Sequence, residues 1–181
     1  MTATKRGAAV LLLGLAGAGC ARESAAPVPA PAPGAGAPPA APWSAAPLDA
    51  ATLPDVYMTA WSAAPDREKC ELLAPARVEP SAIARRATFS GGWGVAYDLP
   101  ELRSAFGVAG TGPLTPDVYD DWPHHIEWSD GSRAGYGPEG GQGPNQLAYL
   151  TIAGRDCLYN VWSRLGVAHL EGLLDELRFV R

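Results

Sequence analysis

Glycine-containing turns between short β-prone runs constrain the fold of this chain more than any other feature of its sequence. Asp130-Gly131 lies between two such runs, and a two-residue Asp-Gly turn is a strong hairpin signal. Similar pairs of runs flank residues 90–92 and 153–156. Strands joined by turns this short pair antiparallel with their neighbours, so the sequence predicts one antiparallel sheet of about six strands.

Helical patterns lie on both sides of the β-prone region. Residues 54–63 start with a proline that suits a first helical turn and then place apolar side chains on one face. Residues 165–177 carry leucines at helical spacing. Neighbouring prolines also predict short helices at 66–73 and 99–106, and residues 115–117 (Thr-Pro-Asp) form a further helix start. We therefore expect an α+β fold in which an N-terminal and a C-terminal helix pack on the sheet.

The first 20 residues follow a pattern that is typical of exported proteins. Lys5 and Arg6 precede an apolar run over residues 8–16, which is shorter than the roughly 20 residues needed to cross a bilayer. Two small residues then lead to Cys20. This pattern resembles the signal peptide and lipobox of bacterial lipoproteins. The resemblance covers residues 1–20 alone and carries no information about the fold of the remaining chain.

The lipoprotein resemblance implies both a cellular location and a means of attachment to the membrane. It implies cleavage after residue 19, lipid including palmitate on Cys20, and a tether to a membrane of the cell envelope. Because Ala21 stands where inner-membrane lipoproteins usually carry aspartate, it further implies the outer membrane in a Gram-negative host. An ordinary secretory signal is the alternative, since residues 16–18 (Ala-Gly-Ala) also fit a signal-peptidase site.

A segment rich in alanine and proline follows, over residues 21–48, with almost no charge after Glu23. Prolines remove backbone donors and block helix formation, so such a segment is extended. We expect it to be a disordered spacer between the membrane and a folded domain. The predicted organisation is a signal peptide at 1–19, a lipidated cysteine with its spacer at 20–48, and one globular domain at 49–181.

Three cysteines in an exported protein leave one thiol without a partner. If Cys20 carries lipid, Cys70 and Cys157 remain as a pair that an oxidising compartment would join. Their disulfide would close a loop of about 87 residues, which is worth roughly 4 kcal/mol of stability in the chain-entropy model. Two buried free thiols are the alternative.

The charge of the predicted domain argues against one class of partner. From Asp49 onward the chain has 18 acidic and 11 basic residues, a net charge of −7. An acidic domain of this kind offers no basic patch that would bind a phosphate backbone, so nucleic acid is not an expected partner.

Aromatic residues supply the candidate ligand surface. Trp93, Trp122 and Trp128 lie near glycine-rich or acidic segments, where they could line a groove for a glycan or a peptide. Their alternative role is packing in the core. His125 and Glu127 extend the candidate surface, because alternate residues of a strand share one face.

Catalytic and metal motifs are weak in this sequence. The helical H-E-x-x-H motif and the G-x-S-x-G nucleophile motif are absent, and two ligands on one strand do not make a metal site. We expect no cofactor and no metal.

Two functions therefore remain open. The first is an envelope lipoprotein of unknown task, whose non-catalytic domain binds an envelope protein, a glycan or a small ligand. The alternative is an envelope hydrolase that uses His125, Glu127 or His169. Its acids would come from the segment that carries Asp120 and Asp121.

Overall fold

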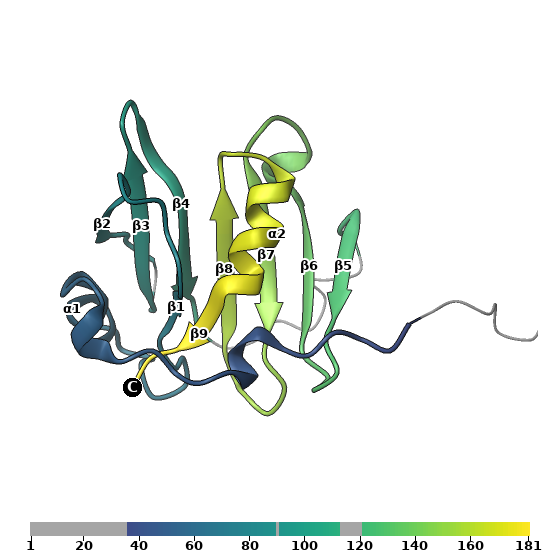
Figure 1. Ribbon diagram of the computed structural model, residues 1–181, viewed down its shortest axis with the longest axis horizontal. Coiled ribbons are helices and arrows are strands. Elements are labelled where there is room, and N and C mark those ends of the chain that lie inside the picture. The colour runs from purple at the N-terminus through teal and green to yellow at the C-terminus, as the bar shows by residue number, and fades with distance from the viewer. Residues whose placement is uncertain (1–35, 90, 113–120) are drawn as a thin grey trace, which may run out of the picture. The chain divides into compact units, whose positions relative to one another are not determined.

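The computed structural model describes residues 36–89, 91–112 and 121–181. Within these residues the α-helices are α1 (Val56–Ser62) and α2 (Val167–Glu176), and 3₁₀ turns span Pro42–Ser44, Ala50–Thr52 and Glu139–Gly141. The strands, drawn as arrows in Figure 1, are β1 (Leu73–Pro75), β2 (Ile83–Arg86), β3 (Trp93–Leu99), β4 (Leu102–Gly110), β5 (His124–Glu127), β6 (Arg133–Pro138), β7 (Gln146–Thr151), β8 (Leu158–Ser163) and β9 (Leu177–Phe179). The predicted signal peptide, Cys20 and the helix start at 115–117 lie outside the described residues. Within the described ranges, no helix is long and apolar enough to span a membrane.

Seven strands form one antiparallel sheet in the order β2-β3-β4-β8-β7-β6-β5. Two meanders, β2-β3-β4 and β5-β6-β7-β8, meet where β4 pairs with β8. Strands β1 and β9 form a separate antiparallel pair. The predicted α+β class and the three predicted hairpins are confirmed. The prediction of about six strands was too low, because it missed β1, β4 and β9.

Strand β4 occupies a segment that the sequence predicted as a helix over 99–106. That prediction is wrong, because Pro100 and Glu101 form the tight turn of a β3-β4 hairpin in which the two flanking leucines pair. Glu101 has a positive φ of 65°, as the second central residue of such a turn requires. The small residues that follow run between β3 and β8, where both edges of β4 are hydrogen-bonded.

Residues 66–73 also depart from the predicted helix. They form successive turns in which the Asp66 N–H donates to the Gly91 carbonyl and the Cys70 N–H donates to the Asp66 carbonyl. Cys70 is joined to Cys157, just before β8, with Cα atoms 5.0 Å apart, which confirms the predicted disulfide. Both cysteines are fully buried, so the bond ties these turns to the late strand inside the core.

The two faces of the seven-stranded sheet differ in what covers them. Helix α1 packs on β2 and β3, and α2 packs on β7 and β8, as seen in Figure 1. We call this side the helical face; its side chains include Tyr97, Phe106, Tyr136, Tyr159 and Val161. We call the other side the open face. It carries the residues that alternate along each strand with those of the helical face, among them Gly94, Gly107, His125, Glu127, Gly137, Leu147, Tyr149, Asn160 and Trp162.

The first described residues belong to the folded domain rather than to the spacer. Trp43 is buried and packs edge-on against Trp128, with ring centroids 4.9 Å apart, and its Nε1 donates to Asp130 at 2.9 Å. A parallel β-bridge also ties this segment to the C-terminal residues. The folded region that the structure describes therefore includes residues that precede Asp49.

Candidate functional site

The open face has a floor of small residues on which larger side chains lie. A Cβ atom on Gly107 would come within 2.2 Å of the Trp162 ring, so the indole rests directly on this glycine. In the same way the Phe89 ring rests on Gly94, where a Cβ atom would meet it at 2.6 Å. Because a side chain at either glycine would occupy this space, the two glycines let the aromatic rings lie close against the sheet.

Two pairs of aromatic residues lie on this face. The rings of Phe89 and Trp162 have centroids 5.7 Å apart, and Trp122 meets Tyr149 edge-on at 5.4 Å. Trp162, Tyr149 and Leu147 stay partly exposed although they belong to the central strands β7 and β8. These three residues and Phe89 border a hollow of about 460 Å³. A concave surface with clustered, partly exposed apolar side chains is typical of a ligand site.

Asn160 places a polar group in the floor of the hollow. It lies on β8, in register with Tyr149 of β7 and Ala109 of β4. Its Oδ1 is buried and, within the described part of the chain, is the one buried side-chain oxygen or nitrogen without a hydrogen-bond partner. Leaving a buried acceptor unpaired costs about 1–3 kcal/mol. A buried acceptor without a partner is unusual in a folded protein. Because this oxygen is buried, it lies beneath the surface of the hollow rather than open to a ligand.

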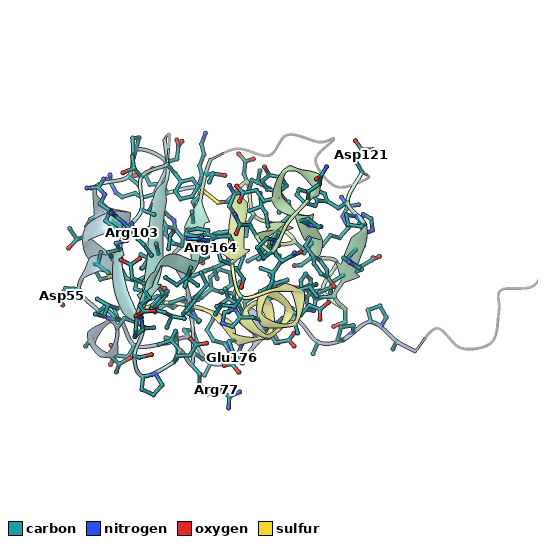
Figure 2. All side chains as sticks on the ribbon, turned by 90° about the horizontal axis from the view of Figure 1, so that it is seen from above. Asp55, Arg77, Arg103, Asp121, Arg164 and Glu176 are labelled. Carbon is teal, nitrogen blue, oxygen red and sulfur yellow. A yellow bond between two sulfur atoms is a disulfide. The ribbon has the colours of Figure 1, made fainter. Side chains whose placement is uncertain are left out.

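Polar residues form the rim of the hollow at one end of the sheet. Arg164 donates from Nη1 to the Arg103 carbonyl at 2.8 Å and from Nε to Asn145 Oδ1 at 3.4 Å; Arg103 and Arg164 are labelled in Figure 2. The Glu139 N–H donates to the Asn145 carbonyl at 2.8 Å. The rim therefore presents one cationic and one anionic side chain, Arg164 and Glu139, with an amide between them.

Two of the three tryptophans predicted for the ligand surface belong to the core. Trp93 is 1% exposed, and its Nε1 donates to the Cys70 carbonyl at 3.1 Å. Trp128 is 2% exposed and lies against Trp43. Neither indole is open to a ligand. The turns around the disulfide enclose Trp93, and the segment before Asp49 encloses Trp128. Trp122 alone of the three remains partly exposed.

Strand β5 separates its two histidines as the sequence predicted. His125 and Glu127 lie on the open face, whereas His124 stacks on Tyr136 of the helical face with ring centroids 5.1 Å apart. Burial and a hydrogen bond to Glu171 raise the pKa of Tyr136 to about 12, so this phenol stays protonated and donates to the carboxylate. No three His, Cys, Asp or Glu side chains within the described ranges are grouped so that they could hold a metal ion.

His169 belongs to a chain of hydrogen bonds on the helical face. Its Nδ1 lies 3.0 Å from Ser163 Oγ, and its Nε2 lies 3.0 Å from Glu79 Oε1. By residue type this order resembles a catalytic triad. Ser163 is fully buried, however, and its Oγ accepts the Leu165 N–H at 3.0 Å. The three residues therefore fasten α2 and the loop of Glu79 to β8, and they present no nucleophile to solvent.

Among the residues predicted for a hydrolase, the structure separates His169 from His125 and Glu127. Asp121 lies on the side of the sheet away from α2, as Figure 2 shows, and Asp120 lies outside the described residues. His169 has both ring nitrogens bonded on the helical face, whereas His125 and Glu127 occupy the open face. These described side chains form no shared hydrogen-bonded site.

The sequence prediction did not single out Leu147, Tyr149 or Asn160. The alternation within 147–151 and 158–162 held a usable signal, because the register of this hairpin puts these residues on one face with Trp162. Which of the two faces the helices would cover depends on tertiary packing, and local pattern does not determine it.

Replacing Asn160 by leucine is expected to stabilise the domain. Leucine is similar in size and removes the buried acceptor that has no partner, so we expect the free energy of unfolding to rise by about 1 kcal/mol. Urea denaturation followed by tryptophan fluorescence measures this change. The matched control is Asn145→Leu, which removes an amide that does accept a hydrogen bond and is expected to be neutral or slightly destabilising. Equal destabilisation by both variants would contradict an unpaired Oδ1.

A serine-directed fluorophosphonate is expected to leave the folded protein unmodified. Ser163 is buried and its hydroxyl is held between Leu165 and His169, so a phosphonylating reagent has no access to it. Intact-mass spectrometry after incubation measures the outcome. An adduct that appears on the native protein and is lost in Ser163→Ala would show instead that this serine is an accessible nucleophile.

The chain matches no protein-family model, no curated protein and no solved structure in comparisons with known proteins. The fold by itself assigns no activity, because unrelated functions recur on one fold. What the open face can bind therefore follows from its own geometry and chemistry.

Proposed function

We propose that this protein is a lipid-anchored envelope protein whose domain binds a ligand on the open face without catalysing a reaction. The observation that carries the proposal is the hollow, which is bordered by partly exposed aromatic side chains of β7 and β8. Concave and largely apolar surfaces with a few placed polar groups are the usual form of binding sites.

The anchor rests on the sequence of the N-terminal segment. The lipobox that ends at Cys20 provides the attachment to the membrane. The alanine- and proline-rich stretch after it acts as an extended spacer between the membrane and the domain. In the folded domain the Pro39 carbonyl accepts the Ser129 N–H at 2.8 Å, so the chain enters beside the β5-β6 turn.

Catalysis has less support than binding. A hydrolase needs a nucleophile and a base that meet where a substrate can reach them. Ser163 is buried beneath α2, and the histidine of α2 is fully engaged by hydrogen bonds. Ser163 is among the residues that line the hollow, but its hydroxyl is bonded to Leu165 and His169 on the helical face, so no observation favours an enzymatic alternative over the binding proposal.

The anchor can be tested by replacing Cys20 with serine. Serine cannot receive the thioether-linked lipid, so we expect Cys20→Ser to lose incorporation of labelled palmitate and to move from the membrane pellet to the soluble fraction. Ser24→Ala in the neighbouring spacer is the control and is expected to behave as wild type. Unchanged labelling and sedimentation of Cys20→Ser would contradict lipid anchoring at this residue.

The binding face can be tested by photo-crosslinking in intact cells. We expect benzoylphenylalanine at position 147, beside the hollow, to give a ligand-dependent shift in mass or mobility. The same group at position 167 is the matched control, because Val167 is 38% exposed and lies on α2, away from the open face. Equal crosslinking from the two positions, or crosslinking from position 167 alone, would count against the open face.

A further inference from the structure

We infer that the Asp130-Gly131 sequence is a site of spontaneous aspartate isomerisation, and that Trp43 slows this reaction in the folded protein. The inference goes beyond the binding proposal and does not depend on the ligand of the open face. Asp130 is the one aspartate of the chain that glycine follows, and no asparagine precedes a glycine. Glycine in this position favours the reaction, because it has no side chain to hinder its own backbone nitrogen.

The reaction needs no reagent other than water. The backbone nitrogen of Gly131 attacks Cγ of Asp130, so that an N–C bond forms while a C–O bond breaks. The proton of the nitrogen leaves with the carboxyl hydroxyl as water, and a five-membered succinimide ring remains. Water then adds to either ring carbonyl, which gives aspartate or isoaspartate with no net change in mass. In isoaspartate the main chain runs through the former side chain, so the backbone of the turn is one atom longer.

Three hydrogen bonds hold the reacting groups in the structure. Asp130 Oδ1 accepts the Ser132 N–H at 2.9 Å, and Asp130 Oδ2 accepts Nε1–H of Trp43 at 2.9 Å. The Gly131 N–H, whose nitrogen would attack, donates to the Trp128 carbonyl at 2.9 Å. The carboxyl group must turn away from its donors, and the nitrogen must leave its acceptor, before the ring can close.

The same hydrogen bonds favour the less reactive form of the carboxyl group. Burial raises the pKa of Asp130, but the hydrogen bonds from Ser132 and Trp43 outweigh burial, so the pKa of this carboxyl is lowered. The ionised form reacts more slowly, because a carboxylate has no hydroxyl group to lose.

Trp43 is the one of these partners that comes from outside the hairpin. Ser132 and Trp128 lie within two residues of Asp130, whereas Trp43 is 87 residues away in sequence. Its side chain is 6% exposed and packs edge-on against Trp128, which keeps Nε1 directed at Asp130. Isomerisation would displace the carboxylate from Nε1 and would therefore loosen the segment around Trp43 from the β5-β6 turn.

The experiment ages the full-length protein in detergent, at neutral pH and at a temperature where circular dichroism shows every variant to be folded. Peptide mapping with electron-transfer fragmentation measures isoaspartate at position 130 over time. A synthetic peptide of residues 126–134 gives the rate of the same sequence without the fold. We expect the peptide to isomerise and the folded protein to react about tenfold more slowly or less, the factor that one hydrogen bond to a charged group is worth.

Trp43→Phe tests the indole N–H, because phenylalanine keeps an aromatic ring against Trp128 and removes the donor. We expect this variant to isomerise about tenfold faster than wild type. Benzothienylalanine at position 43, an isostere of tryptophan with sulfur in place of the N–H, keeps the test valid if Trp43→Phe folds poorly. Trp61→Phe is the matched control and is expected to keep the wild-type rate, since it removes an indole N–H that donates to the Cys70 carbonyl instead.

The outcomes separate the site from its protection. The isomerisation site is rejected if the peptide forms no isoaspartate. The protection is rejected if the folded wild type reacts as fast as the peptide, or if the variants without the N–H at position 43 age as slowly as wild type. Equal acceleration in Trp43→Phe and Trp61→Phe also rejects the role of Trp43, because it would report a general loss of stability.

Discussion

The pairing of β4 with β8 is the interaction on which the rest of the structure depends. It joins the β2-β3-β4 and β5-β6-β7-β8 meanders into one sheet. Gly107 stands opposite Trp162 in this pair and lets the indole lie across β4. Without the pairing each meander would be a small sheet with little buried surface, which is marginal as an independent fold.

Joining the meanders also gives the sheet two faces with different tasks. The helical face receives α1, α2 and the buried Cys70–Cys157 disulfide, so it supplies the core. The open face keeps partly exposed aromatic rings and the unpaired oxygen of Asn160. Apolar side chains that stay partly exposed on central strands are expected where a surface serves binding.

Local chemistry explains which parts of the fold could be predicted from the sequence. The hairpin around Asp130-Gly131 follows from its turn residues, although the turn spans residues 129–131. The Trp128 N–H donates to the Ser132 carbonyl, and of the Asp-Gly pair Gly131 alone has a positive φ, of 85°. Strand β4 could not be predicted in this way, because Pro100 suits a helix start as well as a turn and long-range pairing with β8 decides between them. The burial of Trp93 and Trp128 likewise depends on distant segments, the turns around the disulfide and the chain around Trp43.

The most direct test of the binding face is a nuclear magnetic resonance titration of the isotope-labelled protein with fractions of a soluble extract from the cell envelope of its host. The side-chain amide of Asn160 and the indole N–H of Trp162 report on the hollow, and the side-chain amide of Asn145 reports on its rim. Binding on the open face predicts that the largest shifts fall on Asn160 and Trp162 and that α2 stays unperturbed. Shifts centred on α2, or a spectrum that no fraction changes, would contradict ligand binding on the open face.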